Sequence, residues 1–399
     1  MITAVNIPKY SLAGNPVIVS INTDSDKEIF LQVIHNNQLI YYCSGFRFEN
    51  NVLEFNISEP LSTILLSPVP DTLGVTLQEL SGFIQPYSIV VWEEGEENNP
   101  TNKADLFVLS GGIDGENFRS LLNEGVSYAE KRYFEDNVNY FLTSRNADNV
   151  INIRENELFP LTLIHSGGPL SFRIYNENED IFNYPTTNLS IEAYALNIGN
   201  IVTHFRNNNK PANMLRIYRN DAYLPVTINI LPALPATNTR RIFFKNSLGA
   251  FECIALTGLM SLHHERNFDE KTYMKRIGHE QYLLCRERVA EDISFKGSAG
   301  YKTQSEMFFL ADMLGSDEVY LEGSDSVLQR VIAKTDDDII SLNDERTPAS
   351  IEINLTLAET NKYQRPTFFA SEQQEFQVLV DNEEDFVIDE EDTFITDFI

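Results

Sequence analysis

Short runs of β-branched and aromatic residues, broken by polar turns, recur along this chain at a nearly constant spacing. Near its start, VIVSI (17–21) and IFLQVI (29–34) flank NTDSDKE, while LIYYCSGFRF (39–48) and VLEFNIS (52–58) flank ENN. Runs of about five to eight residues with turns every eight to twelve are typical of antiparallel sandwiches and barrels. The sequence therefore predicts a mainly β fold, with two or three antiparallel β-sandwich-like domains and a few short helices.

The length and composition support several packed cores. The chain has 399 residues, of which 42% are hydrophobic and 11% aromatic, so wholesale disorder is excluded. We predict an N-terminal β-sandwich domain at residues 1–103 and a second β-rich domain at 104–235. A third β-rich domain, with one helix at 303–314, is predicted at 236–366, and an acidic C-terminal tail at 367–399.

The first unit is expected to close with the strand YSIVVWEE (87–94), after which GEENNPTNK (95–103) is a linker or a long hairpin loop. The second unit opens with the strand DLFVL (105–109), followed by a short helix over 116–123. Further strands are predicted in NYFLTSR (139–145) and FPLTLIH (159–165). Two more are predicted at 170–179 and 214–223, which share the letters R-I-Y. The shared letters fit a weak internal repeat or two hairpin strands with equivalent turns.

The third unit contains RRIFFKNSLGAFECIAL (240–256), which predicts a strand, a turn and a second strand. Gly249 ends the turn and is expected to adopt a backbone angle closed to larger residues. TQSEMFFLADMLG (303–315) is the best helix pattern, because Thr303 and Glu306 match a capping box. The alternation in IEINLTLAE (351–359) predicts a half-buried strand.

The charge excludes some classes of partner. The formal net charge is −29, so the surface repels phosphate groups, and we expect no direct nucleic-acid binding. No apolar run approaches the roughly 18 residues of a membrane span, so no membrane insertion is expected. Cys43, Cys253 and Cys285 form no CxxC pair, and MITAVNIPKYSLAGNPVIV does not have the pattern of a secretion signal; both favour a reducing site of synthesis.

Cys253, in FECIAL, is the most nucleophile-like residue. A reactive thiol needs a lowered pKa and a nearby base, yet Glu252 and Glu265 would raise the thiol pKa. We therefore expect a small residue packed in a strand. His263 and His264 follow, but neighbours on a strand face opposite ways and cannot ligate one metal ion unless the chain turns.

Other motifs carry no specific chemistry. NTDSDKE lacks the rest of a twelve-residue calcium loop, and SGGIDGENF lacks the lysine of a P-loop and the spacing of GxGxxG. Asp336, Asp337 and Asp338 are expected to form a solvated turn, and no single Asp or Glu stands in a distinctive apolar motif. We predict no catalytic, cofactor-binding or metal-binding residues, no cofactor and no enzymatic activity.

Two remaining features bear on partners. Trp92, the only tryptophan, is expected to pack at the end of a strand, because sugar-binding platforms usually need more such residues. The stretch DNEEDFVIDEEDTFITDFI (381–399) has nine acids interleaved with Phe, Val and Ile, and no Lys or Arg follows Arg365. This tail is either a flexible solvated segment or a strand that docks on a basic partner or a sheet edge.

Several stretches together resemble a family of tail or baseplate-region structural proteins of Bacteroidetes tailed phages and prophages. They are LAGNPVIVSINTDS, FVLSGGID, YFLTSRNADNVINIRENELFPL, RIFFKNSLGAFECIALTG and LADMLGSDEVYL, at 12–25, 107–114, 140–161, 241–258 and 310–321. The family form has Gly-Gly-Phe where this chain has Gly249-Ala250-Phe251. The resemblance reaches about residue 360, leaves the acidic tail unexplained and supplies no catalytic residues.

The resemblance implies a non-enzymatic structural component of a virion, from the tail, baseplate or neck, made in the cytoplasm of a host bacterium. Its expected partners are further copies of itself and other virion proteins, joined through strand edges and aromatic surfaces. The alternative is a carbohydrate-binding or host-adhesion module of the virion or the cell surface. A glycan hydrolase is a third, weaker reading.

Overall fold

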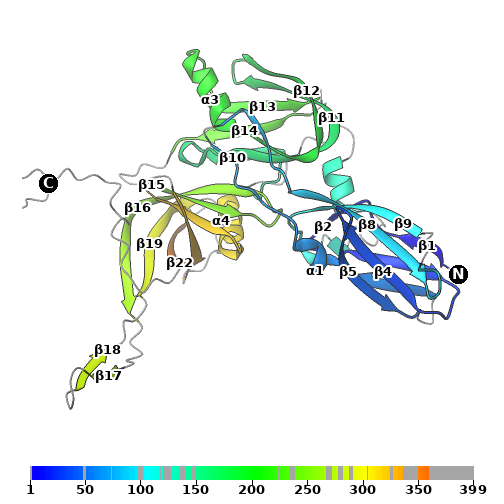
Figure 1. The fold of residues 1–399 in the computed structure, drawn as a ribbon. Helices are drawn as coiled ribbons and strands as arrows, with labels where there is room; N and C mark the ends of the chain where they lie inside the picture. Colours follow the sequence, from blue (N-terminus) through cyan, green and yellow to red (C-terminus); the bar gives the residue numbers. More distant parts are fainter. Residues whose placement is uncertain are drawn as a thin grey trace, which may run out of the picture.

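The computed structural model is a chain of β-rich units (Figure 1), which confirms the predicted mainly β class. The structure describes residues 2–47, 51–72, 74–97, 102–116, 118–119, 127–134, 140–145, 149–220, 222, 224–233, 239–266, 272–276, 282–286, 291–302, 304–323, 327–335 and 349–358.

The first unit, here the sandwich unit, packs two sheets face to face. One sheet has the order β1 (Ile2–Asn6), β3 (Ile18–Thr23), β6 (Val52–Asn56). The other has the order β2 (Tyr10–Leu12), β9 (Asn102–Leu109), β8 (Ile84–Glu93), β4 (Ile29–His35), β5 (Gln38–Gly45), and helix α1 (Ser58–Ser62) follows β6. Alternate residues of β3 and β4, among them Val19, Ile21, Leu31 and Val33, are buried between the sheets. This alternation is the physical basis of the sequence prediction.

The predicted domain boundary at residue 103 lies inside a strand of this unit. β9 runs antiparallel to β8, with Asn102 opposite Val91 and Leu109 opposite Ile84. The apolar residues Leu106 and Val108 are buried in the sandwich core, which explains why the strand belongs here. The segment between β8 and β9 is therefore the loop of a hairpin and not an interdomain linker.

The second unit, here the six-stranded unit, is a single mixed sheet with one helix. Its order is β10 (Val150–Arg154), β14 (Val226–Leu231), β13 (Met214–Arg219), β11 (Leu161–Asn176), β12 (Ile181–Leu196), β7 (Leu77–Glu79). Helix α3 (Ile198–Asn207) begins at Asn197, whose side chain accepts a hydrogen bond from the Asn200 amide. Its buried positions, Ile198, Ile201, Val202 and Phe205, are three or four residues apart and join the apolar core of the sheet.

Two sequence expectations for this unit meet different outcomes. The R-I-Y stretches pair with each other, Ile174 lying opposite Ile217 in adjacent antiparallel strands. NYFLTSR (139–145) is not a strand, and its described residues have irregular backbone. A helix over 116–123 falls largely outside the described residues, while the short turns η1 (Glu130–Phe134) and η2 (Glu155–Glu157) were not anticipated.

The third unit is a closed barrel, whereas a sandwich-like domain was expected. Its strands follow the order β15 (Thr239–Lys245), β16 (Phe251–Arg266), β19 (Glu291–Lys302), β22 (Ala349–Leu357), β21 (Leu328–Lys334), β20 (Val319–Glu322). β15 also pairs with β20, and this contact between distant segments closes the sheet. The predicted strand–turn–strand and the final alternating strand are confirmed.

Helix α4 (Gln304–Gly315) confirms the predicted helix and packs Met307, Phe309, Leu310 and Met313 into the barrel core. A separate hairpin, β17 (Thr272–Arg276) and β18 (Tyr282–Arg286), lies beyond the ends of β16 and β19 (Figure 1). Thr303, Asp336–Asp338 and the acidic tail lie outside the described residues. Among the helices that the structure describes, none has the length and apolar character needed to cross a membrane.

Candidate functional site

The loop at 246–250, where the barrel meets the sandwich unit, is held by direct backbone contacts. Gly249 has φ +87°, and a Cβ there would lie 2.6 Å from the carbonyl carbon of Ser110. Gly111 has φ +89°, and its Cβ would lie 2.1 Å from the carbonyl carbon of Leu248. The amide of Gly112 donates to the Ser247 carbonyl at 2.7 Å. The left-handed angle expected at Gly249 is confirmed, and here glycine also serves a close approach of two loops.

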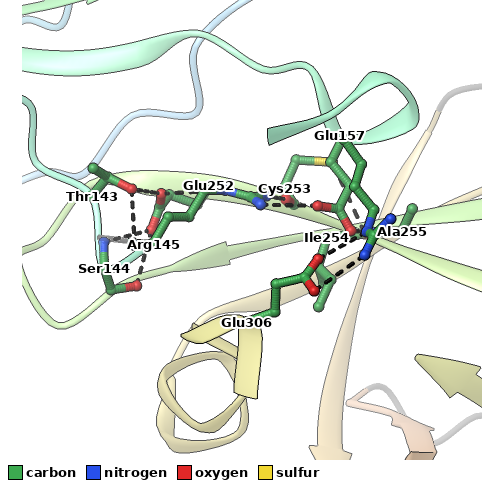
Figure 2. Close-up of polar contacts among 10 residues, drawn as sticks. Thr143, Ser144, Arg145, Glu157, Glu252, Cys253, Ile254, Ala255 and Glu306 are labelled. Atoms are coloured by element: carbon green, nitrogen blue, oxygen red, sulfur yellow. Dashed lines mark hydrogen bonds and ion pairs between the residues drawn. The ribbon is translucent and has the colours of Figure 1, made fainter. Parts of the chain in front are cut away.

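A buried charged cluster lies beside this loop and joins the six-stranded unit to the barrel (Figure 2). The Arg145 guanidinium donates to Glu157 Oε2 at 2.9 Å and to the Cys253 carbonyl, and lies 3.9 Å from the centre of the Phe309 ring. Its Nε is 3.9 Å from Glu252 Oε1. All three charged side chains, Arg145, Glu157 and Glu252, are at most 8% exposed. One cation therefore lies between two buried carboxylates.

Glu252 accepts hydrogen bonds from two segments of the chain, residues 143–144 and Asn246. Thr143 Oγ1 donates to Glu252 Oε1, and Oε2 accepts from the Ser144 amide at 3.1 Å and from Asn246 Nδ2 at 2.9 Å. Burial raises the pKa of the Glu252 carboxyl, although Arg145 and these donors act in the opposite direction. The irregular backbone of residues 143–145 is thus explained, because it presents amide and hydroxyl donors to a carboxylate in place of a strand partner.

The second carboxylate, Glu157, belongs to the turn η2. Its Oε1 accepts from the amide of Ala255 at 3.1 Å, so it links the six-stranded unit to β16 of the barrel. Close by, Arg154 Nε donates to Glu306 Oε1 of α4 at 2.8 Å (Figure 2). Hydrogen bonds of these charged side chains therefore link three segments that are far apart in the sequence.

Cys253 has the packed environment expected from its sequence. It is 1% exposed and packs with Phe159, Phe243 and Phe251. Desolvation raises the pKa of its thiol to about 12. The direction was expected, but its main cause is burial and not the adjacent Glu252. At neutral pH the sulfur is a neutral thiol, and in this environment it is a poor nucleophile.

The other residues weighed in the sequence are dispersed. His263 and His264 are both in β16, opposite Ser294 and Ile293 of β19, and their side chains lie outside the described part of the structure. Among the described residues, no group of three or more His, Cys, Asp or Glu side chains is arranged to hold a metal ion. Trp92 is 7% exposed and stacks on Phe30 at 5.7 Å between ring centres, so its predicted packing role is confirmed.

The sequence carried one unused signal for the cluster. Glu252 interrupts the apolar run FECIAL, and a carboxylate there has to be buried when the strand enters a core. The expectation that no acid stands in a distinctive apolar setting was therefore wrong for Glu252. Arg145 and Glu157 have no comparable signal, because Arg145 ends the predicted strand NYFLTSR and Glu157 stands in the polar stretch ENE, where charged residues are ordinary.

The outer face of the six-stranded unit bears a small polar and aromatic hollow. It has a volume of about 420 Å³ and is lined by Arg173, Tyr175, Glu179, Tyr218 and Ala222. The rings of Tyr175 and Tyr218 meet edge to face at 5.5 Å. Aromatic rings beside charged groups are a combination that binds sugar rings and hydroxyls.

A larger hollow of about 830 Å³ lies in the sandwich unit, between the β1–β2 connection and residues 127–130. Two of its polar side chains hydrogen-bond within the protein: Glu130 Oε1 accepts from the backbone amide of Lys9 at 2.9 Å, and Asn15 exchanges hydrogen bonds with the backbone of Ile113.

Strand β5 is the outermost strand of the five-stranded sheet and carries exposed apolar side chains. Leu39 and Tyr42 are 56% and 49% exposed, and Phe46, just beyond the strand, is 59% exposed. Tyr42 extends a row of rings through Phe30 to Trp92. Residues 36–46 contain no charged side chain in a chain of net charge −29. A long, uncharged, apolar edge is a site where another strand can pair.

No protein-family model and no curated protein matches this sequence.

Proposed function

We propose that this protein is a non-enzymatic structural component of a phage virion, from the tail, baseplate or neck, that acts through β interfaces between subunits. It would be made in the cytoplasm of the host bacterium and would bind further copies of itself and other virion proteins. The resemblance of the five sequence stretches supports the phage assignment. The mainly β architecture and the buried, fully engaged charged cluster are compatible with a part that assembles.

The observation that carries the proposal is the uncharged edge of β5. Soluble monomers protect edge strands with charges, prolines or coverings, whereas β5 exposes Leu39 and Tyr42 along an open margin. Two copies of net charge −29 repel each other most weakly where no charged side chain intervenes. Pairing at this edge would cover the apolar side chains and satisfy the free backbone groups.

Light scattering after size-exclusion chromatography tests the interface. The wild-type protein should form a defined oligomer as its concentration rises, and Leu39→Lys with Phe46→Lys should leave it monomeric. The matched control places the same two charges at other exposed apolar positions, Val75→Lys with Leu224→Lys, and should still assemble. A wild-type protein that stays monomeric at every concentration, alone and with particle extracts, would contradict the proposal.

Electron microscopy tests the phage assignment. Gold-labelled antibodies against this protein should bind the tail end or neck of particles induced from a host that carries the gene. Particles that remain unlabelled, although the protein is abundant in the lysate, would argue against a virion component.

A carbohydrate-binding role is the second candidate, and the tyrosine-lined hollow of the six-stranded unit favours it. Tyr175→Ala with Tyr218→Ala should abolish binding on a glycan array while the oligomer persists. An array with no wild-type signal would remove this candidate.

A further inference from the structure

The hairpin of β17 and β18 forms a sheet of its own, separate from the barrel. It stands well away from the barrel wall, past the ends of the long strands β16 and β19 (Figure 1). Isolated two-stranded hairpins are at best marginally stable in water. Among the described residues, each of the two strands pairs with the other alone, which leaves one edge of each strand without a described neighbour. A further strand would complete this small sheet.

The two strands have a composition that is unusual for this chain. TYMKR and YLLCR contain Lys275, Arg276 and Arg286 and no acid, although acids outnumber basic residues by 59 to 30 overall. In the register of the hairpin, Lys275 lies opposite Leu283 and Arg276 opposite Tyr282. Lys275 and Arg276 thus each lie opposite a leucine or a tyrosine of the partner strand. We call these two strands the basic hairpin.

The acidic tail has the complementary pattern. Residues 381–399 contain nine acids and seven Phe, Val or Ile residues, with no basic residue. The acids and the apolar residues fall in short successive blocks, among them EED, FVI, DEED and FI, so an extended tail would bring both kinds of residue to a hairpin whose strands contain basic and apolar residues. Opposite charges would favour docking, and the electrostatic part of the attraction would weaken as salt screens it.

The path of the chain brings the tail to the hairpin. β22 runs from Lys302, its neighbour at Ala349, toward Ser294, its neighbour at Thr356. Ser294 also pairs with His263, at the level from which β16 and β19 continue toward the hairpin. The chain therefore leaves the barrel on the hairpin side. Asp381 lies 23 residues beyond Ala358, so the chain between them can span at most roughly 80 Å, which exceeds the roughly 30 Å that the nine residues from His263 to Thr272 can span.

We propose that residues 381–399 dock as a strand on the basic hairpin of the same chain. Tethering gives the tail an effective concentration in the millimolar range, so modest pairing affinity suffices. The docked tail would cover an open edge that would otherwise pair with another chain. This inference does not depend on the proposed virion role, because it follows from charge, register and chain path alone.

Hydrogen–deuterium exchange of the full-length protein tests the docking. Amides of β17 and β18 should be protected in the wild type. Reversal of the hairpin charges by Lys275→Glu, Arg276→Glu and Arg286→Glu should speed their exchange on the order of tenfold. Reversal of three tail acids by Glu383→Lys, Glu384→Lys and Asp385→Lys should do the same. The two sets combined should restore protection, because the charges are then exchanged.

The matched control changes three exposed lysines elsewhere, Lys27→Glu, Lys103→Glu and Lys334→Glu, and should leave hairpin exchange unaltered. Unchanged exchange in β15 would show in every variant that the barrel is folded. Hairpin exchange that is equal in the wild type and the tail variant would overturn the docking. Protection of the hairpin that grows with protein concentration would overturn docking within one chain. It would show that the hairpin binds the tail of a second copy.

Discussion

At the scale of single residues, Arg145 decides how the charged cluster is tolerated. A buried carboxylate without a partner is strongly unfavourable, and Arg145 lies against both Glu157 and Glu252. The guanidinium suits this position because its planar fork can donate to a carboxylate and a carbonyl while it stacks on Phe309. The cluster thus connects the six-stranded unit to the barrel through buried, charge-assisted hydrogen bonds.

Arg145→Ala should destabilise the protein by about 3–5 kcal/mol, because it leaves buried carboxylates without their cation. Chemical denaturation followed by circular dichroism would measure the loss. The control is Arg47→Ala, which removes an ion pair to Asp26, whose side chain is 89% exposed, and should cost about 0–1 kcal/mol. Equal effects of the two substitutions would show that the buried cluster has no special weight.

The raised pKa of Glu252 predicts a pH dependence of definite sign. A carboxyl whose pKa is higher in the folded state binds more protons when folded, so its stabilising contribution is full below the unfolded pKa of about 4.3. That contribution is lost as pH rises through the folded pKa. The stability of the wild type relative to Glu252→Gln should therefore fall as the pH rises from about 4.3 toward neutrality. Denaturation midpoints of both proteins would be measured over this range. A constant difference between the two midpoints at every pH would refute the prediction.

At the scale of elements, the 246–250 loop shows how a local turn also sets a long-range contact. The Asn246 amide donates to the Ala250 carbonyl at 2.8 Å, which closes the turn between β15 and β16. The same loop packs on the backbone of Ser110 and Gly111 from the sandwich unit. Its sequence requirement is therefore stricter than that of a simple hairpin loop.

Gly249→Ala should cost about 3 kcal/mol or more, because a Cβ meets both a left-handed angle and a backbone atom at 2.6 Å. Gly95→Ala is the matched control, since Gly95 has φ +89° with nothing within 4 Å of the added Cβ. It should cost about 1–2 kcal/mol from the backbone angle alone. Thermal unfolding would compare the melting temperatures of the two variants. Equal decreases would mean that the loop rearranges to accept the added Cβ at little energetic cost.

At the scale of the whole molecule, the units are not independent, because one of them contributes a strand to the sheet of another. β7 follows the first half of the sandwich unit in sequence, yet it pairs with β12, with Leu77 opposite Leu196. The Asn197 side chain donates to the Thr72 carbonyl at 3.0 Å, and Asn200 donates to that of Gly74 at 2.9 Å. The helix start of the six-stranded unit is therefore held by the chain that leaves the sandwich unit.

A fragment of residues 149–233 should consequently fold poorly by itself, because it lacks β7 and these two contacts. Co-expression with residues 1–116 should restore soluble, folded material. Soluble yield and far-ultraviolet circular dichroism would report the difference. A monodisperse fragment with the full chain's melting temperature would show that the contribution of β7 is dispensable.

Local patterns were sufficient for much of the secondary structure. Short β-branched and aromatic runs between polar turns placed β3 and β4, alternation placed β22, and a capping-box pattern ending at Gly315 placed α4, because each of these signals depends on residues close together in the sequence. The turn before Cys253 and the packing of that thiol were predictable for the same reason. These features depend on neighbours a few residues apart.

Closure of the barrel, the pairing of β7 with β12 and the pairing of Arg145 with Glu252 depend on segments separated by dozens to more than a hundred residues. The local periodicity of the sequence does not show which strands will pair, or which carboxylate will be buried away from water. Amphipathic spacing encodes that a segment becomes a strand or a helix. Long-range packing and desolvation, which exist once the units are in contact, select its neighbours and bury the charged cluster.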